Sequence, residues 1–336
     1  MKTIKALSKL SIFEIGKTLS EVNESVLKEP HMVQFYNRYA TYNGSSPYST
    51  PGIMTVIQHL ESHYGTFIPE EGMHSITKSL YELAKRKGVV FNFNKQVSEI
   101  TLKRNRAAAL IVEGEELPFD TIISNMDIYL TYEKLLPKIK LPRNVKIQER
   151  SSSAVIFYWG VSKRFHNLDL HNVFFSKDYR DEFDSIFIKK TIYDDPTIYV
   201  NITSKEIPND SPENGENWFV MINTCADNGQ NWDIEVKKLR KIVLNRLEAI
   251  LGESISSLIE EEEIFTPKTI EKRTKSYKGS LYGSSSNSLF SAFLRHPNFS
   301  SKIKNLYFCG GSVHPGGGIP LCLLSAKITT ELIDKS

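Results

Sequence analysis

The sequence predicts a mixed α/β fold, and three stretches in which strand and helix patterns alternate carry this prediction. Near the end of the chain, an apolar run at 306–309 leads through glycines into a helix pattern with proline in its first turn. In the middle, an amphipathic helix pattern at 73–87 precedes strand patterns between 89 and 124. Between these two stretches, strand patterns within 154–223 precede a helix pattern at 234–251.

The glycine-rich turn near the C-terminus is the most informative part of the chain. It joins the apolar run at 306–309 to a helix that begins around Pro320, through Gly310, Gly311 and a second glycine cluster at 316–318. Glycine lets a backbone approach a ligand without interference from a Cβ atom. Proline in the first helical turn removes no needed hydrogen bond, and the N–H groups beyond it lie at the positive end of the helix dipole. The pattern indicates a site for a partly negative ligand atom, although a plain tight turn has the same spacing.

The first 124 residues predict helices followed by strands. Residues 1–64 read as mainly helical, with one candidate helix at 53–63. The helix at 73–87 is predicted to end at Gly88. Its inward face is predicted to consist of Ile76, Leu80, Leu83 and Ala84. The strands are predicted at 89–91, at 97–102 and 108–112 as a hairpin, and at 117–124.

The longest block, 129–304, predicts a sheet and a long helix. Strands are predicted at 154–160, 197–202 and 218–223. Asp233 is the predicted N-cap of the helix and Gly252 its end. The acidic run at 260–263 is predicted to be a solvated edge. Such a block suits a substrate domain with an apolar tunnel, and it suits an ordinary core equally well.

Composition excludes several classes of protein. The 336 residues carry 42 Lys and Arg against 39 Asp and Glu, a net charge of +3 that is too balanced for nucleic-acid binding. No run of eighteen apolar residues is present, and the first residues lack the features of a secretory signal. Cys225, Cys309 and Cys322 have no disulfide or metal-site spacing, so a cytoplasmic location is expected.

Two further patterns each have a simpler interpretation. His59 and His63 flank Glu61, but the glutamate does not occupy the position of the H-E-x-x-H motif, so no metal site is predicted. At the N-terminus, lysines alternate with apolar residues in an amphipathic pattern. A first helix packed on the body of the protein is the favoured interpretation, and peripheral contact with the cytoplasmic face of a membrane stays open. The lysines are Lys2, Lys5 and Lys9, and the apolar residues are Ile4, Leu7, Leu10, Ile12 and Phe13.

The C-terminal turn resembles the signature of the phytoene desaturase-like carotenoid desaturases, which are flavoproteins related to the amine oxidases. In that family, a strand is followed by G-x-G, by T-H-P-G-x-G-I-P and by a helix that carries Ser-Ala-Lys. The residues that match are Gly310, His314, Pro315, Gly316, Gly318, Ile319, Pro320 and 325–327. Gly311 and Ser312 stand where the family more often has Ala-Gly.

The resemblance extends along nearly the whole chain and keeps the family's order. Asn-Gly-Ser-Ser-Pro-Tyr at 43–48 resembles the N-P-[FY] segment, and 67–73 resembles F-P-x-G-G-[MT] with Glu71 in place of a glycine. The remaining matches are V-x-x-I at 97–100, S-N-A-D at 124–127 (with Met126 for alanine) and G-S-x-Y-G at 279–283.

The resemblance implies an amine oxidase-type flavoprotein fold with an interleaved substrate domain. The segments that it implies are a helical part of the substrate domain (1–64), a flavin-domain segment (65–128), the substrate domain (129–304) and a second flavin-domain segment (305–336). The family's opening G-x-G-x-x-G turn, which binds the FAD pyrophosphate, does not occur in the sequence. The chain therefore resembles the C-terminal two thirds of a desaturase, as a fragment, a split gene product or a truncated relative. We expect its flavin-domain sheet to expose an apolar edge, and a partner chain or self-association to cover it.

The resemblance also implies FAD as cofactor and a long isoprenoid as substrate. Gly310, Gly311 and Ser312 are expected along the ribityl-pyrophosphate part of FAD, Val97 at its adenine, and Asn125 near the crossover between domains. The turn at Gly318, Ile319 and Pro320 is expected to present the Leu321 N–H to the flavin ring. His314 is the one candidate base, and fixing the turn is the alternative role for it.

Two functions follow from these observations. The first is an oxidoreductase of carotenoid biosynthesis that introduces C=C bonds into phytoene or a hydroxycarotenoid. The second is a non-catalytic relative that binds an apolar ligand or a partner but not FAD. The glycines retained at 310–318 favour the first, because a relative that no longer binds the cofactor is expected to lose them. The missing pyrophosphate turn favours the second.

Overall fold

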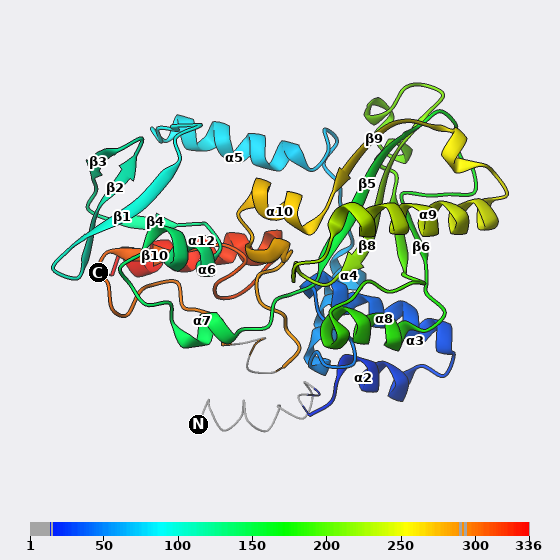
Figure 1. Cartoon of the computed structure of the whole chain (residues 1–336), viewed down its shortest axis with the longest axis horizontal. Helices are drawn as coiled ribbons and strands as arrows, with labels where there is room; N and C mark the ends of the chain where they lie inside the picture. Colours follow the sequence, from blue (N-terminus) through cyan, green and yellow to red (C-terminus); the bar gives the residue numbers. More distant parts are fainter. Residues whose placement is uncertain (1–13, 15, 289–290, 292–293, 336) are drawn as a thin grey trace. The chain divides into compact units, whose positions relative to one another are not determined.

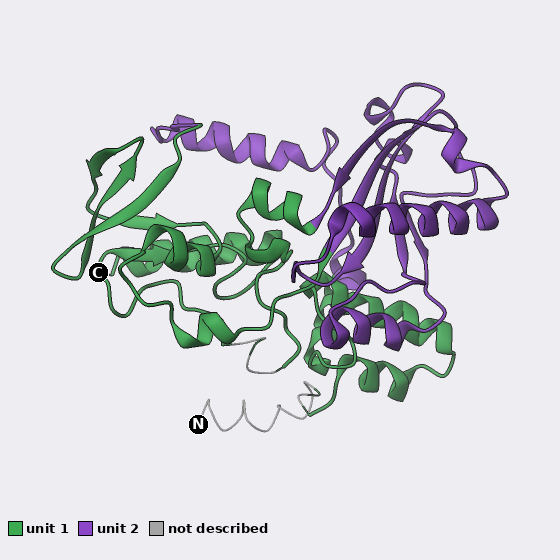
Figure 2. Ribbon diagram, viewed as in Figure 1, with its two compact units in different colours: residues 1–60, 94–153, 267–336 green, residues 61–93, 154–266 purple. Residues whose placement is uncertain are grey.

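The chain divides into two compact units in the computed structural model, which describes residues 14, 16–288, 291 and 294–335 (Figure 1). Unit 1 comprises residues 1–60, 94–153 and 267–336, and unit 2 comprises 61–93 and 154–266 (Figure 2). The chain thus passes between the units after residues 60, 93, 153 and 266. The predicted boundaries after residues 64, 128 and 304 separate a flavin domain from a substrate domain. They do not coincide with the boundaries of the two compact units, and the assignment of these domains stays a prediction. The N-terminal amphipathic pattern with Lys2, Lys5 and Lys9 lies outside the described residues.

Unit 1 contains a three-stranded antiparallel sheet in the order β1 (Val97–Lys103), β2 (Arg106–Val112) and β3 (Glu115–Pro118). The first two strands form the predicted hairpin. Arg104 and Asn105 make its turn with φ of 49° and 59°, which matches the right-handed twist of the strands. The prediction of a single strand at 117–124 is wrong. The segment divides because β3 pairs with β2, whereas β4 (Ile122–Ser124) pairs with a different strand.

The predicted strand, glycine turn and helix at the C-terminus are confirmed. Strand β10 (Leu306–Phe308) pairs in parallel with β4, and helix α12 (Ile319–Ile333) follows the turn. The buried face of α12 is polar: Ser325 Oγ accepts a hydrogen bond from the Gly310 N–H at 3.1 Å, and Thr329 Oγ1 donates to the Phe308 carbonyl at 2.9 Å. Two side chains of the helix therefore fasten it to the end of β10.

The apolar core of unit 1 lies around the β4–β10 pair. Ile122 of β4 and Leu306 and Phe308 of β10 pack there with residues of β1 and of the short helix α6. The described residues of unit 1 also form the helices α2 (Leu19–Val26), α3 (Pro30–Asn37), α7 (Arg143–Ile147) and α10 (Pro267–Thr274), and α6 spans Ile128–Leu130. Helix α4 (Thr55–Tyr64), close to the helix predicted at 53–63, crosses the boundary between the units.

Unit 2 is built on a five-stranded sheet and a long helix. The strand order is β6 (His171–Phe174), β7 (Ile198–Asn201), β8 (Glu216–Thr224), β5 (Ser153–Val161) and β9 (Ile259–Phe265). One face packs Val155, Phe157, Trp159 and their neighbours against α9 (Trp232–Leu251). A short helix, α8 (Tyr179–Asp184), also belongs to this unit. The acidic run at 260–263 lies on the edge strand β9, as predicted.

Two predicted details of unit 2 are wrong. Helix α9 begins at Trp232 with Asn231 as N-cap, two residues before the predicted cap Asp233, because the buried Trp232 ring is already part of the helix and donates its Nε1–H to Asp227. Residues 89–91 form no strand. The Val89 N–H instead donates to the Ala84 carbonyl and closes the end of the preceding helix.

Helix α5 (His74–Arg86) confirms the helix predicted at 73–87. The prediction that Ile76, Leu80, Leu83 and Ala84 form a buried inward face is wrong. Leu80 and Leu83 are 48% and 43% exposed, and no residue of α5 is buried. Apolar residues that follow the helix, including Val90 and Phe93, are exposed as well. Within its own unit, this segment therefore presents an apolar surface.

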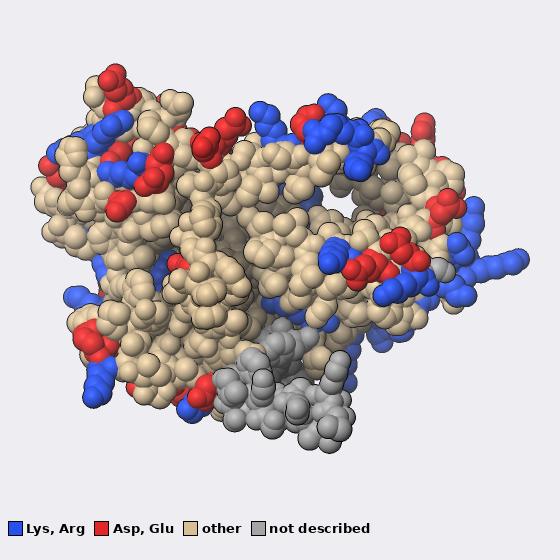
Figure 3. All heavy atoms as spheres, turned by 180° about the vertical axis from the view of Figure 1, so that it is seen from behind, with Lys and Arg blue, Asp and Glu red and all other residues tan. Residues whose placement is uncertain are grey.

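The charged side chains carry no dominant sign on the face drawn in Figure 3, where Lys and Arg mix with Asp and Glu. This distribution agrees with the net charge of +3. Among the described helices, none has both the length and the apolar character that a membrane crossing requires.

Candidate flavin site

Two cavities of unit 1 share a border made by Asn125 and Lys275. The first, of about 270 Å³, lies beside the glycine turn and the start of α12. The second, of about 460 Å³, lies between β1 and β4. Of the predicted cofactor residues, the first cavity is lined by Asn125, Gly311, Ser312 and Gly318, and the second by Val97 and Asn125.

Strand pairing explains why residues so far apart in the sequence meet at the first cavity. Strands β4 and β10 are parallel neighbours, so the segments that leave their carboxyl ends emerge at the same edge. Asn125 Nδ2 donates to the Cys309 carbonyl at 3.1 Å, and the Ile128 N–H donates to Ser312 Oγ at 3.0 Å. These two bonds hold the segment after β4 against the turn after β10.

The glycines of the turn serve two different purposes. A Cβ atom on Gly310 would lie 2.6 Å from Asn125 Nδ2, and one on Gly317 would lie 2.8 Å from Tyr282 Cδ1. These positions need glycine because the protein itself fills the space. Gly318 has φ of +100°, and nothing lies within 4 Å of a Cβ built there. Only at Gly318, which lines the first cavity, does the backbone face the open space that a ligand needs.

The first turn of α12 borders this cavity less closely than predicted. Ile319 and Pro320 are exposed, Leu321 is half-buried, and none of the three lines the cavity. Pro320 is the second helical residue rather than the first. The Leu321 N–H precedes the first intrahelical bond, which runs from the Cys322 N–H to the Gly318 carbonyl at 2.9 Å. The positive end of the helix dipole is thus at the cavity's edge.

His314 and Gly310 lie away from the cavity lining. The His314 side chain is exposed, while its carbonyl accepts from Asn298 Nδ2 at 2.9 Å. Asn298 is buried and also donates to the Phe308 carbonyl and to Ser325 Oγ. Through one amide group, Asn298 therefore connects the strand, the turn and the helix. Gly310 is buried behind Asn125.

A buried ion pair stands at the wall of the first cavity. Arg150 Nη1 lies 3.6 Å from Asp127 Oδ2, and their side chains are 8% and 3% exposed. The Arg150 guanidinium also lies over the rings of Tyr129 and Tyr277, whose centroids are 3.7 Å apart. Burial raises the pKa of Asp127 and lowers the pKa of Arg150, and their mutual attraction opposes both changes.

Sequence reasoning missed several residues that line the first cavity, among them Asp127, Lys275, Tyr282 and Cys322. The Asp127 and Tyr282 positions were contained in the matched S-N-A-D and G-S-x-Y-G motifs, so a signal existed for them. Lys275 and Cys322 had none. Lys275 is the most informative omission, since it is the cation at the border of both cavities.

Comparisons with known proteins show the family of the chain. Residues 5–333 match the family described as flavin containing amine oxidoreductase. The chain is 52% identical over 332 residues to 1-hydroxycarotenoid 3,4-desaturase of Flavobacterium sp. (strain P99-3), covering 99% of this chain and 68% of that protein. It is 32% identical over 318 residues to phytoene desaturase of Fusarium fujikuroi, covering 88% of this chain and 56% of that protein.

The solved structures show the same fold at low sequence identity. An oxidoreductase from Methanosarcina mazei has a TM-score of 0.66 at 15% identity, with 97% of this chain and 71% of that chain covered. A variant of putrescine oxidase has a TM-score of 0.56 at 10% identity, with 98% and 70% covered. The predicted mixed α/β flavoprotein fold is therefore confirmed. The chain belongs to the flavin containing amine oxidoreductase family, in which the carotenoid desaturases are among its relatives.

Proposed function

We propose that this chain is an FAD-dependent carotenoid desaturase whose substrate is a hydroxylated carotenoid. The observation that carries the proposal is the meeting of Asn125, Gly311, Ser312 and Gly318 at one cavity beside the N-terminus of α12. The relative at 52% identity supports the substrate class, since its name gives a hydroxycarotenoid. Because the chain spans 68% and 56% of its desaturase relatives, the activity of the whole protein is part of the proposal.

Outside the missing pyrophosphate-binding turn, the residues present fit FAD. Gly318 offers open space at a backbone conformation that only glycine adopts readily, and the first turn of α12 offers unpaired N–H groups. Gly311 and Ser312 would lie along the ribityl-pyrophosphate part, Asn125 would lie at the border of the two cavities, and Val97 in the second cavity would border the adenine part. Bound FAD would supply the oxidising chemistry, accepting two electrons and a proton from a saturated C–C unit while a second proton leaves.

The side chains around the first cavity would orient the cofactor and substrate and exclude water, and they would not react themselves. Burial raises the pKa values of the Cys309 and Cys322 thiols, so neither is a ready nucleophile. Asp127 and Arg150 are engaged with each other and with the tyrosine pair. The chain's contribution would be a dry cavity wall, a positive helix end and fixed hydrogen-bond donors.

The apolar substrate supports one further part of the proposal. A long isoprenoid dissolves in membranes rather than in water, so we propose that the protein acts from the cytoplasmic side in peripheral contact with a membrane. Co-sedimentation with lipid vesicles tests this: binding that is lost when apolar residues of α5 such as Leu80 and Leu83 become polar would support it. Absence of any vesicle binding would contradict it.

Turnover tests the proposed function directly. The purified chain would be loaded with FAD and supplied with a hydroxycarotenoid or with phytoene in detergent micelles. Each added C=C bond lengthens the conjugated system, so the product absorbs at longer wavelength. We expect turnover of the hydroxycarotenoid by the wild-type chain and its loss in Gly318→Val, with exposed Ile234→Val of unit 2 as control. An FAD-loaded chain that converts neither substrate would contradict the proposal.

A further inference from the structure

Arg295 is a buried cation without an anionic partner. Arg295 is only 8% exposed, and no carboxylate among the described residues forms an ion pair with it. Burial alone lowers its pKa to about 10, so the guanidinium stays charged at neutral pH. A charge held in the interior without a counter-charge is expensive, and such groups concentrate where their field is used.

The hydrogen bonds of Arg295 go to the backbone that lines the first cavity. Nη1 donates to the carbonyls of Tyr282 at 3.0 Å and Gly311 at 3.2 Å. Nη2 donates to the Ser284 carbonyl at 3.0 Å and to Ser286 Oγ at 3.4 Å. Tyr282 and Gly311 themselves line the cavity. Arg295 therefore lies one residue layer behind the cavity wall.

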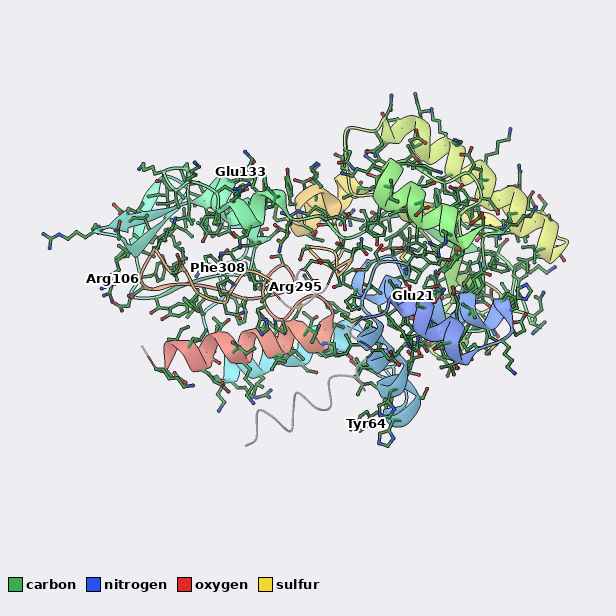
Figure 4. All side chains as sticks on the ribbon, turned by 90° about the horizontal axis from the view of Figure 1, so that it is seen from below. Glu21, Tyr64, Arg106, Glu133, Arg295 and Phe308 are labelled. Atoms are coloured by element: carbon green, nitrogen blue, oxygen red, sulfur yellow. The ribbon has the colours of Figure 1, made fainter. Side chains whose placement is uncertain are left out.

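The guanidinium also lies against the second glycine cluster. A Cβ atom on Gly316 would lie 3.0 Å from Arg295 Nε, and Nε has no hydrogen-bond partner. Figure 4 labels Arg295 near the loop that leads into α12, in the same unit. The fixed charge is thus in contact with the glycine cluster that directly precedes the N-terminus of α12.

We propose that Arg295 is a positioning residue whose buried charge makes the bound flavin easier to reduce. By accepting hydrogen bonds from Arg295, the carbonyls of Tyr282 and Gly311 are directed away from the cavity. The guanidinium also adds positive potential where a reduced flavin carries negative charge. The inference rests on the proposed function only in requiring that the cavity hold the flavin part of FAD.

The sign and size of the effect follow from Coulomb's law. A positive charge stabilises the more negative, reduced form of the cofactor, so its loss lowers the reduction potential. If the two charges were separated by about 10 Å at an effective dielectric constant of about 20, their interaction would amount to roughly tenfold in an equilibrium constant. For a two-electron couple, tenfold corresponds to about 30 mV.

The test measures the flavin reduction potential and the affinity for sulfite, which reacts reversibly with flavins and binds more tightly beside positive charge. In Arg295→Gln, we expect a potential lower by about 30 mV and sulfite binding weaker by about tenfold. Arg295→Lys keeps the charge and is expected to stay close to wild type in both. The matched control is Arg246→Gln in unit 2, a part-buried arginine that also donates to carbonyls. It should change neither measurement.

A second pair of variants tests the charge without removing the arginine. Ser286→Asp places a carboxylate beside Nη2, whereas Ser286→Asn is its neutral counterpart. The aspartate variant should lower the potential and weaken sulfite binding as Arg295→Gln does, and the asparagine variant should not. If Arg295→Gln does not fold, this pair alone tests whether the buried charge affects the flavin.

The outcomes separate this inference from the proposed function. Unchanged potential and sulfite affinity in Arg295→Gln and in Ser286→Asp, with FAD bound and carotenoid turnover retained, would overturn the inference and leave the proposed function standing. A wild-type chain that binds no FAD would overturn both.

Discussion

The core of unit 2 and the flavin-site region of unit 1 are stabilised by different means. In unit 2, a regular sheet buries large apolar side chains such as Phe157, Trp159 and Leu239 against one helix. In unit 1, the glycine turn is held by single polar groups, namely the Asn298 amide, the Ser325 hydroxyl and the Arg295 guanidinium. Apolar packing tolerates some change in shape, whereas each of these polar groups has one geometry.

The contrast predicts how mutations in the two regions will behave. Apolar truncation in unit 2 should reduce stability and leave the affinity of folded molecules for FAD unchanged. Loss of a polar group in unit 1 should cost less stability and alter the site.

Leu239→Ala in α9 should cost about 2–5 kcal/mol of unfolding free energy, because a fully buried side chain leaves a cavity. Ile234→Ala on the same helix is the matched control, since Ile234 is 61% exposed. Denaturant unfolding measures both variants. A loss of FAD affinity in folded Leu239→Ala would break the contrast between the units.

Asn298→Ala should cost about 1–3 kcal/mol, because the two amide hydrogens are shared among three acceptors, the buried Phe308 carbonyl and Ser325 Oγ and the part-buried His314 carbonyl, which would lose this donor. Unlike Leu239→Ala, it should also weaken FAD binding, since the turn and α12 lose their common attachment. Asn217→Ala in unit 2 is the comparison, because its amide donates to Thr203 and accepts from Ser204 within that unit. Equal FAD affinities in the two variants would argue against a special role for Asn298.

Gly317→Ala and Gly318→Ala should separate the two uses of glycine in the turn. The first places a methyl group 2.8 Å from the Tyr282 ring and should cost about 1–3 kcal/mol without any cofactor present. The second meets no neighbour, but its φ of +100° should cost about 1–3 kcal/mol of stability through backbone strain, and its methyl group, which enters the open space of the cavity, should in addition weaken FAD binding. Thermal unfolding with and without FAD distinguishes the two. If Gly317→Ala unfolds like wild type in the absence of FAD, the packing role is wrong.

The buried Asp127 predicts a small dependence of stability on pH. Because its pKa in the folded protein is raised above the ordinary value of 3.8, the folded state binds a proton more readily than the unfolded state does. Wild type should therefore gain stability relative to Asp127→Asn as pH falls from about 7 toward the ordinary carboxyl range. Chemical denaturation of both proteins across this range measures the difference. The opposite trend would show that attraction to Arg150 outweighs burial.

Local patterns in the sequence predicted most of the regular elements. The apolar run before β10, the hairpin of β1 and β2 and the body of α9 each follow from a short-range periodicity that no distant contact overrides. The errors arose where distant partners decide. Residues 117–124 look like one strand, yet two different neighbours divide them into β3 and β4. The stripe of α5 looks like a core face, yet nothing within its unit buries it.

The candidate site shows the same limit. Motif order located Asn125, Gly311, Ser312 and Gly318, which line one cavity. The glycines do not serve a cofactor alone, since Gly310, Gly316 and Gly317 are confined by Asn125, Arg295 and Tyr282, respectively. Their retention therefore reflects packing as well as a cofactor, and it argues less strongly for catalysis than the sequence suggested. The importance of Arg295 depends on its burial, which no local pattern reveals.

The most direct test of the account is the electron density of the chain crystallised with FAD. The isoalloxazine ring is expected in the cavity beside α12, in contact with Gly318, with the ribityl chain along Gly311 and Ser312 and the adenine part toward Val97. Density that places the ring elsewhere, or side chains that close this cavity when FAD is present, would contradict it.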